Sequence, residues 1–192
     1  MLIDKKDTLF DSKEYIKDES GMTIKIRGNS TPYFDKKTYK IKLQKKGDML
    51  CRGESKFNDK NWLLIKDGDV SINTFIGLKT NELFKLQWTP CYKYVNVVFN
   101  GDYRGVYMLI EAVGRNSKCR LNVDKENGFI IEYDAYWWNE DLYFDSLINS
   151  MFKFTFKYPD SEDLEELQFN QVKSSVYEME NYIIGGTIYM TN

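Results

Sequence analysis

Histidine is absent from the 192-residue sequence, and this absence excludes several kinds of chemistry. Ser-His-Asp and Cys-His catalysis both need a side-chain base that titrates near neutral pH, which only histidine offers in unperturbed form. Zinc sites built on histidine are excluded as well. Any chemistry in this chain must therefore use carboxylates, lysines or a bound metal.

Cysteine is scarce and irregularly spaced. Cys51, Cys91 and Cys119 are odd in number and far apart, which is neither a disulfide framework nor a CxxC metal pattern. We expect them to be buried small hydrophobic residues, with one disulfide possible if the chain is exported.

Long apolar runs and a charge excess are also missing. No run approaches the roughly 20 apolar residues of a membrane-spanning helix, and the N-terminus lacks the apolar segment of a signal peptide. The chain as given is therefore expected to be cytoplasmic, or a mature or trimmed secreted product.

Lys+Arg 27 against Asp+Glu 29 gives no electrostatic case for binding nucleic acid or an anionic membrane. The 42% hydrophobic content is ample for a core, and the length predicts one domain over 1–192.

The stretch Tyr92–Ala112 has the strongest local pattern. Apolar and β-branched residues alternate on either side of Asn100-Gly101, the dipeptide that best tolerates a tight hairpin turn. The pattern predicts an antiparallel hairpin, with Glu111 on a core-facing row. That carboxylate either has a functional role or pairs with a neighbouring cation such as Arg115.

A predicted strand at Ile24–Arg27 runs into a polar loop that begins at Gly28. Such a loop can present backbone N–H groups to a phosphate, although an ordinary turn is the commoner interpretation. The next predicted strand has Tyr39 and Ile41 on one face, and strand parity places Lys37 on the same side. Lys37 either extends to water or holds an anion in a cleft.

After the next predicted strand, the spacing of apolar residues becomes that of an amphipathic helix, which we expect to reach from about Ser71 to Leu86. We expect Asp69 or Ser71 to be its N-cap, and Gly77 to mark a close contact. Its predicted apolar stripe consists of Ile72, Phe75, Ile76, Leu78, Leu83 and Leu86.

The C-terminal sequence pattern predicts two strands, GFIIEYD and MFKFTFKYPD. It also predicts a helix of about twenty residues beyond Pro159, with Glu162, Asp163 and Glu165 in its first turn and Gly185-Gly186 at its end. Glu132 and Asp134 point the same way and either chelate a metal or form a solvated face. An aromatic segment between the strands could be a stacking platform for sugar or peptide, or a loop folded onto its own core. Its residues are Tyr136, Trp137, Trp138, Tyr143 and Phe144.

The order of these elements predicts an α+β fold, mainly an antiparallel sheet with a packed helix, plus a C-terminal helix. The runs IKIRGNSTPYFDKKTYKIKL, NWLLIKDGD, NGDYRGVYMLIEA, GFIIEYD and FTFKYPD together resemble the CotH kinase (spore coat protein H) family. The resemblance covers most of residues 20–160.

This resemblance implies an atypical protein-kinase-like fold, here its N-terminal lobe, that transfers phosphate from ATP, with Mg or Mn, to serine on a surface or coat protein. An extracellular or cell-surface location is implied in the same way. When the family's binding site is carried over to this chain, the resemblance implies five cofactor-binding residues: Arg27, Gly28, Ser30, Lys37 and Glu111. Phosphoryl transfer uses positioned cations and metal-binding carboxylates, so the absence of histidine is compatible with it.

Two features depart from the family pattern. Ile76-Gly77 stands where members usually have an Arg-Asn pair, and no N-x-D or W-D-x-D run follows Pro159 to supply the catalytic aspartates. The sequence therefore predicts a truncated or inactive kinase-like domain that still holds nucleotide. The alternatives are a non-catalytic cell-surface module that binds protein or carbohydrate through its aromatic segment, and a structural domain without a small-molecule site.

Overall fold

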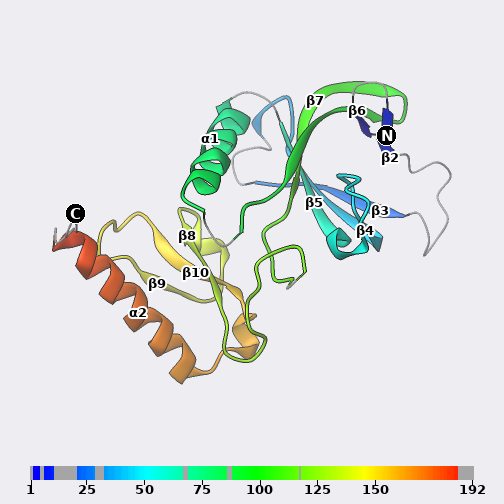
Figure 1. The fold of residues 1–192 in the computed structure, drawn as a ribbon. Coiled ribbons are helices and arrows are strands. Elements are labelled where there is room, and N and C mark those ends of the chain that lie inside the picture. The colour runs from blue at the N-terminus through cyan, green and yellow to red at the C-terminus, as the bar shows by residue number, and fades with distance from the viewer. Residues whose placement is uncertain are drawn as a thin grey trace. The chain divides into compact units, whose positions relative to one another are not determined.

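Seven strands form the sheet of the first of two compact units, Met1–Asn122, in a computed structural model (Figure 1). The structure describes residues 2–4, 7–10, 21–28, 33–66, 69–85, 88–116 and 118–185. The spatial order of the strands is β2-β1-β6-β7-β5-β4-β3, and every pairing is antiparallel. The strands are β1 Leu2–Asp4, β2 Asp7–Phe10, β3 Met22–Ile26, β4 Tyr39–Gly47, β5 Asp59–Lys66, β6 Tyr92–Phe99 and β7 Asp102–Glu111.

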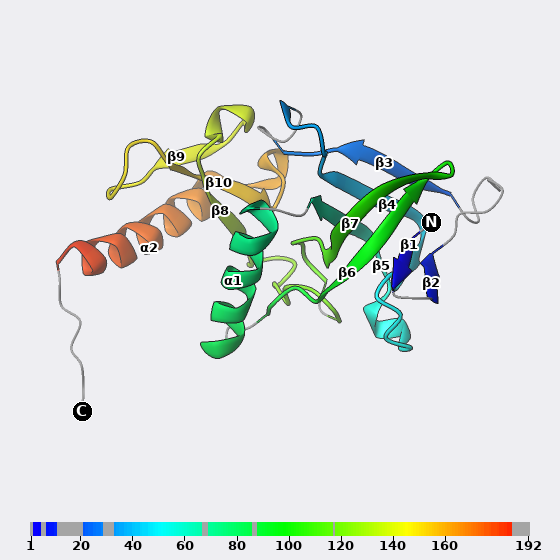
Figure 2. The same ribbon diagram turned by 90° about the horizontal axis from the view of Figure 1, so that it is seen from above.

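The predicted hairpin is confirmed as β6 and β7, the long adjacent strands shown in green in Figure 2. Asn100 and Gly101 both have positive φ, 50° and 83°, as a two-residue hairpin turn requires. β7 is central, because β6 pairs with one of its edges and β5 with the other. The segment with the clearest local pattern therefore organises the sheet.

One face of this sheet carries the main apolar core. Alternate residues of the four central strands are buried there, and Met49 and Leu50 from the β4–β5 connection pack onto them. The strand residues of this core are Ile41, Leu43, Trp62, Leu64, Val95, Val97, Tyr107 and Leu109. Glu111 lies on the same row as Tyr107 and Leu109, as strand parity predicts, and is buried.

The opposite face packs against helix α1, Asp69–Leu83. Leu78 is buried against Met108 and Ile110, and Phe75 contacts the ring of Tyr92 edge-on. The predicted stripe is wrong in part, because Ile76 and Leu83 are exposed. Of the stripe residues whose side chains are described, only Leu78 is buried, whereas Phe75 is 38% exposed and Ile76 is turned about 100° further around the helix.

Two further expectations concern the same helix. The close contact expected at Gly77 is wrong, since no atom lies within 4 Å of the position that a Cβ would occupy there. The side chains of Asp69, Ser71 and Ile72, and all of Leu86, lie outside the described residues.

The second unit, Val123–Asn192, is a three-stranded antiparallel sheet with one helix along it (Figure 1). The strand order is β8-β10-β9, with bounds Ile130–Asp134, Lys153–Tyr158 and Tyr143–Asp145. β8 and β10 were predicted. β9 falls inside the aromatic segment, where its three residues are too few to show a period.

Helix α2, Glu166–Ile184, covers one face of this smaller sheet. Val172 and Val176 pack against Phe144, Phe154 and Phe156. The helix and its end at Gly185 are confirmed. Its predicted first turn is wrong, because Glu162 and Asp163 lie in a separate 3-10 turn, and Glu165 is the N-cap in a capping box with Gln168.

The prediction for the cysteines is right only for Cys119, which is buried. Cys51 and Cys91 are exposed, and no disulfide joins any of the described cysteines. No described helix has the length and apolar content needed to cross a membrane.

The α+β fold class is confirmed by the two antiparallel sheets and two helices. The single domain over 1–192 stays a prediction.

Candidate nucleotide-binding site

The loop between β3 and β4 brings three of the predicted site residues to one end of the sheet. The backbone N–H of Arg27 donates to the carbonyl of Thr38 at 2.9 Å, which closes the loop at its base next to Lys37. Gly28 follows with φ 92°, a conformation that other residues adopt only with strain. Ser30 lies outside the described residues.

Further cations lie in this region. The ammonium of Lys36 donates to the carbonyl of Val106 at 2.7 Å and lies 4.6 Å from the centre of the Tyr107 ring. Lys37, which precedes the first residue of β4, donates to the carbonyl of Phe34. Lys66 lies 3.5 Å from the centre of the Phe34 ring. Arg27, Lys36 and Lys37 come from the connection between β3 and β4, and the backbone N–H of Lys66, at the end of β5, donates to the Thr38 hydroxyl at 3.4 Å. We call the region that carries these four cations the basic loop end.

Glu111 does not belong to the basic loop end. Across the sheet, Ile41 on β4 is level with Trp62 on β5, and Trp62 is level with Glu111 on β7. Lys37 stands four residues before Ile41, so strand geometry places its Cα on the order of 16 Å from that of Glu111. One small ionic contact cannot include both side chains.

Glu111 is instead the centre of a buried ionic cluster. Its side chain is 1% exposed. One oxygen, Oε1, accepts from Nη1 of Arg120 at 2.5 Å and from Nη1 of Arg52 at 2.8 Å, and Oε2 accepts from the backbone N–H of Cys91 at 2.9 Å. Both carboxylate oxygens are thus engaged within the protein.

Arg52 and Arg120 differ in how many of their guanidinium N–H groups have hydrogen-bond partners. Arg52 also bonds Asp48, with Nη2 3.0 Å from Oδ1. Burial alone lowers the pKa of Arg52, but the hydrogen bonds and ion pairs with Asp48 and Glu111 outweigh it, so that pKa lies above its usual value. Arg120 is buried, and its Nε and Nη2 have no hydrogen-bond partner among the described residues. Its guanidinium carbon lies 5.0 Å from the Trp62 ring centre.

This cluster ties the segment after β7, residues 112–122, to the sheet. Besides Arg120, Asn116 donates to Oδ2 of Asp59 at 3.0 Å. Burial raises the pKa of Asp59, but hydrogen bonds from Asn61 and Asn116 and the charge of Arg120 outweigh it, so its pKa is lowered overall. The ion pairs of Glu111 with Arg52 and Arg120 hold the end of β7 and the segment that follows it.

Sequence reasoning missed Arg52, Arg120 and Lys36. Arg52 is 59 residues from Glu111 along the chain, and Arg120 stands in a polar stretch without a period. Lys36 could have been considered beside Lys37, but strand parity favoured its neighbour. No sequence pattern around Arg52 or Arg120 indicates that either would contact Glu111.

The aromatic segment of the second unit is divided between surface and core. Phe144 is buried against α2, whereas Trp138 is 59% exposed and Tyr136 is also exposed. Trp137 lies 4.8 Å from Tyr143, measured between ring centres, and the ammonium of Lys153 lies 4.0 Å from the Trp137 ring. Phe144 is therefore a core residue, and the other four rings form a surface cluster.

Glu132 and Asp134 both face one lysine. The ammonium of Lys157 lies 3.4 Å from a Glu132 oxygen, 3.6 Å from an Asp134 oxygen and 2.5 Å from an oxygen of Glu140. Burial lowers the pKa of Lys157, but these carboxylates outweigh it and raise its pKa overall. In the described part of the chain, no three His, Cys, Asp or Glu side chains come together as a metal site.

Residues 24–184 match the family described as CotH kinase protein. The chain belongs to the CotH kinase family. No curated protein and no solved structure matches it. The α+β arrangement of this CotH chain is consistent with the kinase-like fold that the family implies.

Proposed function

We propose that this CotH chain binds the phosphates of ATP at the basic loop end of its first unit. The observation that carries the proposal is that the β3–β4 connection, with its Gly28 turn, and the adjoining end of β5 together carry Arg27, Lys36, Lys37 and Lys66. Membership of the CotH kinase family supports it.

The chemistry of the cluster suits a polyphosphate. Arginine and lysine bind phosphate oxygens by charge-assisted hydrogen bonds, which are stronger than neutral ones. Cations alone do not catalyse transfer, because kinase chemistry also needs carboxylates that hold magnesium. Among the described residues, no three His, Cys, Asp or Glu side chains are grouped as a metal site, and the proposal covers binding only.

Within this proposal Glu111 has a supporting role. Its carboxylate is 1% exposed and fully engaged, so it holds β7 and the following segment in place and does not contact the nucleotide. Lys36 becomes the lysine of first interest, because its ammonium extends across the sheet to Val106 on β7.

Calorimetric titration with ATP, with and without Mg or Mn, tests this function. Replacing Lys36 or Lys37 by alanine should weaken binding about tenfold or more, since a hydrogen bond to a charged group contributes about 1.5–3 kcal/mol. Lys45→Ala removes an exposed lysine from β4, the strand that follows Lys36 and Lys37, and should leave the affinity unchanged. Adenosine, which lacks phosphates, should bind much more weakly than ATP.

The proposal fails if ATP does not bind the wild-type chain. It also fails if Lys45→Ala lowers the affinity as much as Lys36→Ala, because the effect would then reflect net charge. A thermal shift offers a second readout, as ligand at 100 times its Kd stabilises the folded state by about 2.7 kcal/mol.

A second candidate function is ligand binding by the surface aromatic cluster, favoured by the exposure of Trp138 and Tyr136. Rings that expose a face stack on sugars and peptides. Titration with a cello-oligosaccharide should quench tryptophan fluorescence in the wild-type chain and not in Trp138→Ala. Unchanged fluorescence with both this sugar and a proline-rich peptide would remove the support for this function.

A further inference from the structure

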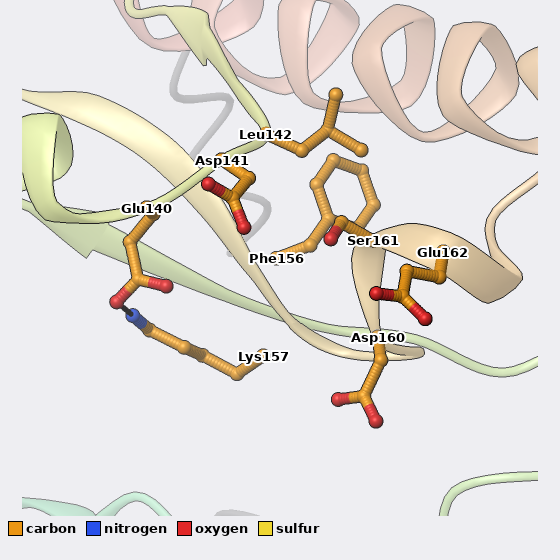
Figure 3. A pocket seen from close by; sticks show the side chains of 8 residues that line it. All are labelled: Glu140, Asp141, Leu142, Phe156, Lys157, Asp160, Ser161 and Glu162. Atoms are coloured by element: carbon orange, nitrogen blue, oxygen red, sulfur yellow. Dashed lines mark hydrogen bonds and ion pairs between the residues drawn. The ribbon is translucent and has the colours of Figure 1, made fainter.

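The second unit contains a hollow of about 440 Å³ with a strongly acidic lining (Figure 3). Its wall includes Glu140 and Asp141 from the segment before β9, and Asp160 and Glu162 from the segment after β10. Leu142 and Phe156 also line it. The hollow therefore combines carboxylates with an apolar patch.

The one lysine in the lining cannot neutralise these acids. Lys157 is already shared by Glu140, Glu132 and Asp134, and Figure 3 marks its contact with Glu140. Within the described residues, Asp141, Asp160 and Glu162 form no ion pair. Three carboxylates thus face one cavity without a cation from the described chain.

Short backbone turns fix the chain segments that carry these exposed acids. The N–H of Asp163 donates to the carbonyl of Asp160 at 2.9 Å, and the N–H of Glu140 donates to the carbonyl of Trp137 at 3.1 Å. Groups that are already positioned lose less conformational entropy when a ligand binds. Carboxylates held together without a cation repel one another, so a bound cation would also relieve that repulsion.

We propose that this hollow binds a lysine or arginine side chain from a basic segment of a partner protein. The volume lies within the range of about 300–1,000 Å³ that is typical of ligand pockets. Leu142 and Phe156 offer apolar surface to the aliphatic stem of such a side chain, and the carboxylates accept hydrogen bonds from its charged head. A bare metal ion would make no use of the apolar wall.

Fluorescence anisotropy with a labelled synthetic peptide of alternating arginine and glycine tests this binding. The double variant Asp160→Asn/Glu162→Gln removes two charges with little change of volume and should bind the peptide about threefold to tenfold more weakly. The control Glu166→Gln/Glu178→Gln makes the same charge change at exposed positions of α2 and should bind like the wild type.

Three results would overturn the inference: no binding by the wild type, equal loss in both double variants, or competition by spermine or Mg²⁺ as effective as that by unlabelled peptide. The inference is independent of the nucleotide proposal, because Lys36→Ala should bind this peptide normally. A failure of ATP binding therefore leaves this test unaffected, and the reverse also holds.

Discussion

Replacing Arg120 by methionine should destabilise the first unit strongly. The change removes a guanidinium whose side chain is 2% exposed and which lies 2.5 Å from Glu111, while keeping most of the side-chain length. Loss of one partner of a buried ion pair costs about 3–5 kcal/mol, because the other charge stays buried.

The expected cost lies near the lower limit, at about 3 kcal/mol. Glu111 keeps Arg52 at 2.8 Å and the N–H of Cys91 at 2.9 Å, so its charge is not left alone. In Arg120 itself, Nε and Nη2 have no partner among the described residues, so no other bonds from these atoms are lost. A loss of this size lowers the melting temperature of a unit of this length by about 10 °C.

Urea unfolding measures this cost, and urea is preferred to guanidinium chloride because it does not screen charges. The matched control is Arg104→Met, which breaks an exposed pair with Asp102 and should cost less than about 1 kcal/mol. Equal unfolding midpoints for the two variants would refute the assignment of the buried cluster as the anchor of β7 and residues 112–122.

Two further predictions concern buried Glu180 and partly buried Asp59. Glu180→Ala should cost about 2–3 kcal/mol in urea unfolding, because the Ser146 hydroxyl and the Leu147 N–H lose their acceptor, whereas a cost for exposed Glu178→Ala above about 0.5 kcal/mol would contradict the role of burial. The folded-state pKa of Asp59 is lowered, so its contribution to stability is present above the ordinary aspartate pKa and is lost as pH falls through the folded value. The stability difference between wild type and Asp59→Asn should therefore shrink as the solution is acidified, and a difference that stays constant in pH-dependent urea unfolding would contradict this.

The sequence predicted those strands, turns and helix ends that are specified by a few neighbouring residues. Asn100-Gly101 and the alternation around it specify a hairpin turn and two strand faces, and the structure has both. Helix α2 ends at Gly185, as the sequence indicates. In α1, by contrast, the apolar stripe was too wide to show which side would meet the sheet, and Ile76 and Leu83 are exposed.

The candidate site was predictable to a smaller extent. The two strands on either side of the Gly28 loop follow from sequence, and Arg27 and Lys37 lie at one end of the sheet because a single connection carries both. Lys36 was missed because its reach to Val106, 70 residues away, depends on β4, β5 and β7 being neighbours.

By itself, the sequence determined the α+β class, the β6–β7 hairpin and the strand face that Glu111 shares with Tyr107 and Leu109. Only the tertiary structure decided which cations meet that carboxylate, because Arg52 and Arg120 reach it from two different connections. Hydrophobic periodicity encodes which face of an element is buried, and it carries no information about which distant charged side chains will meet there.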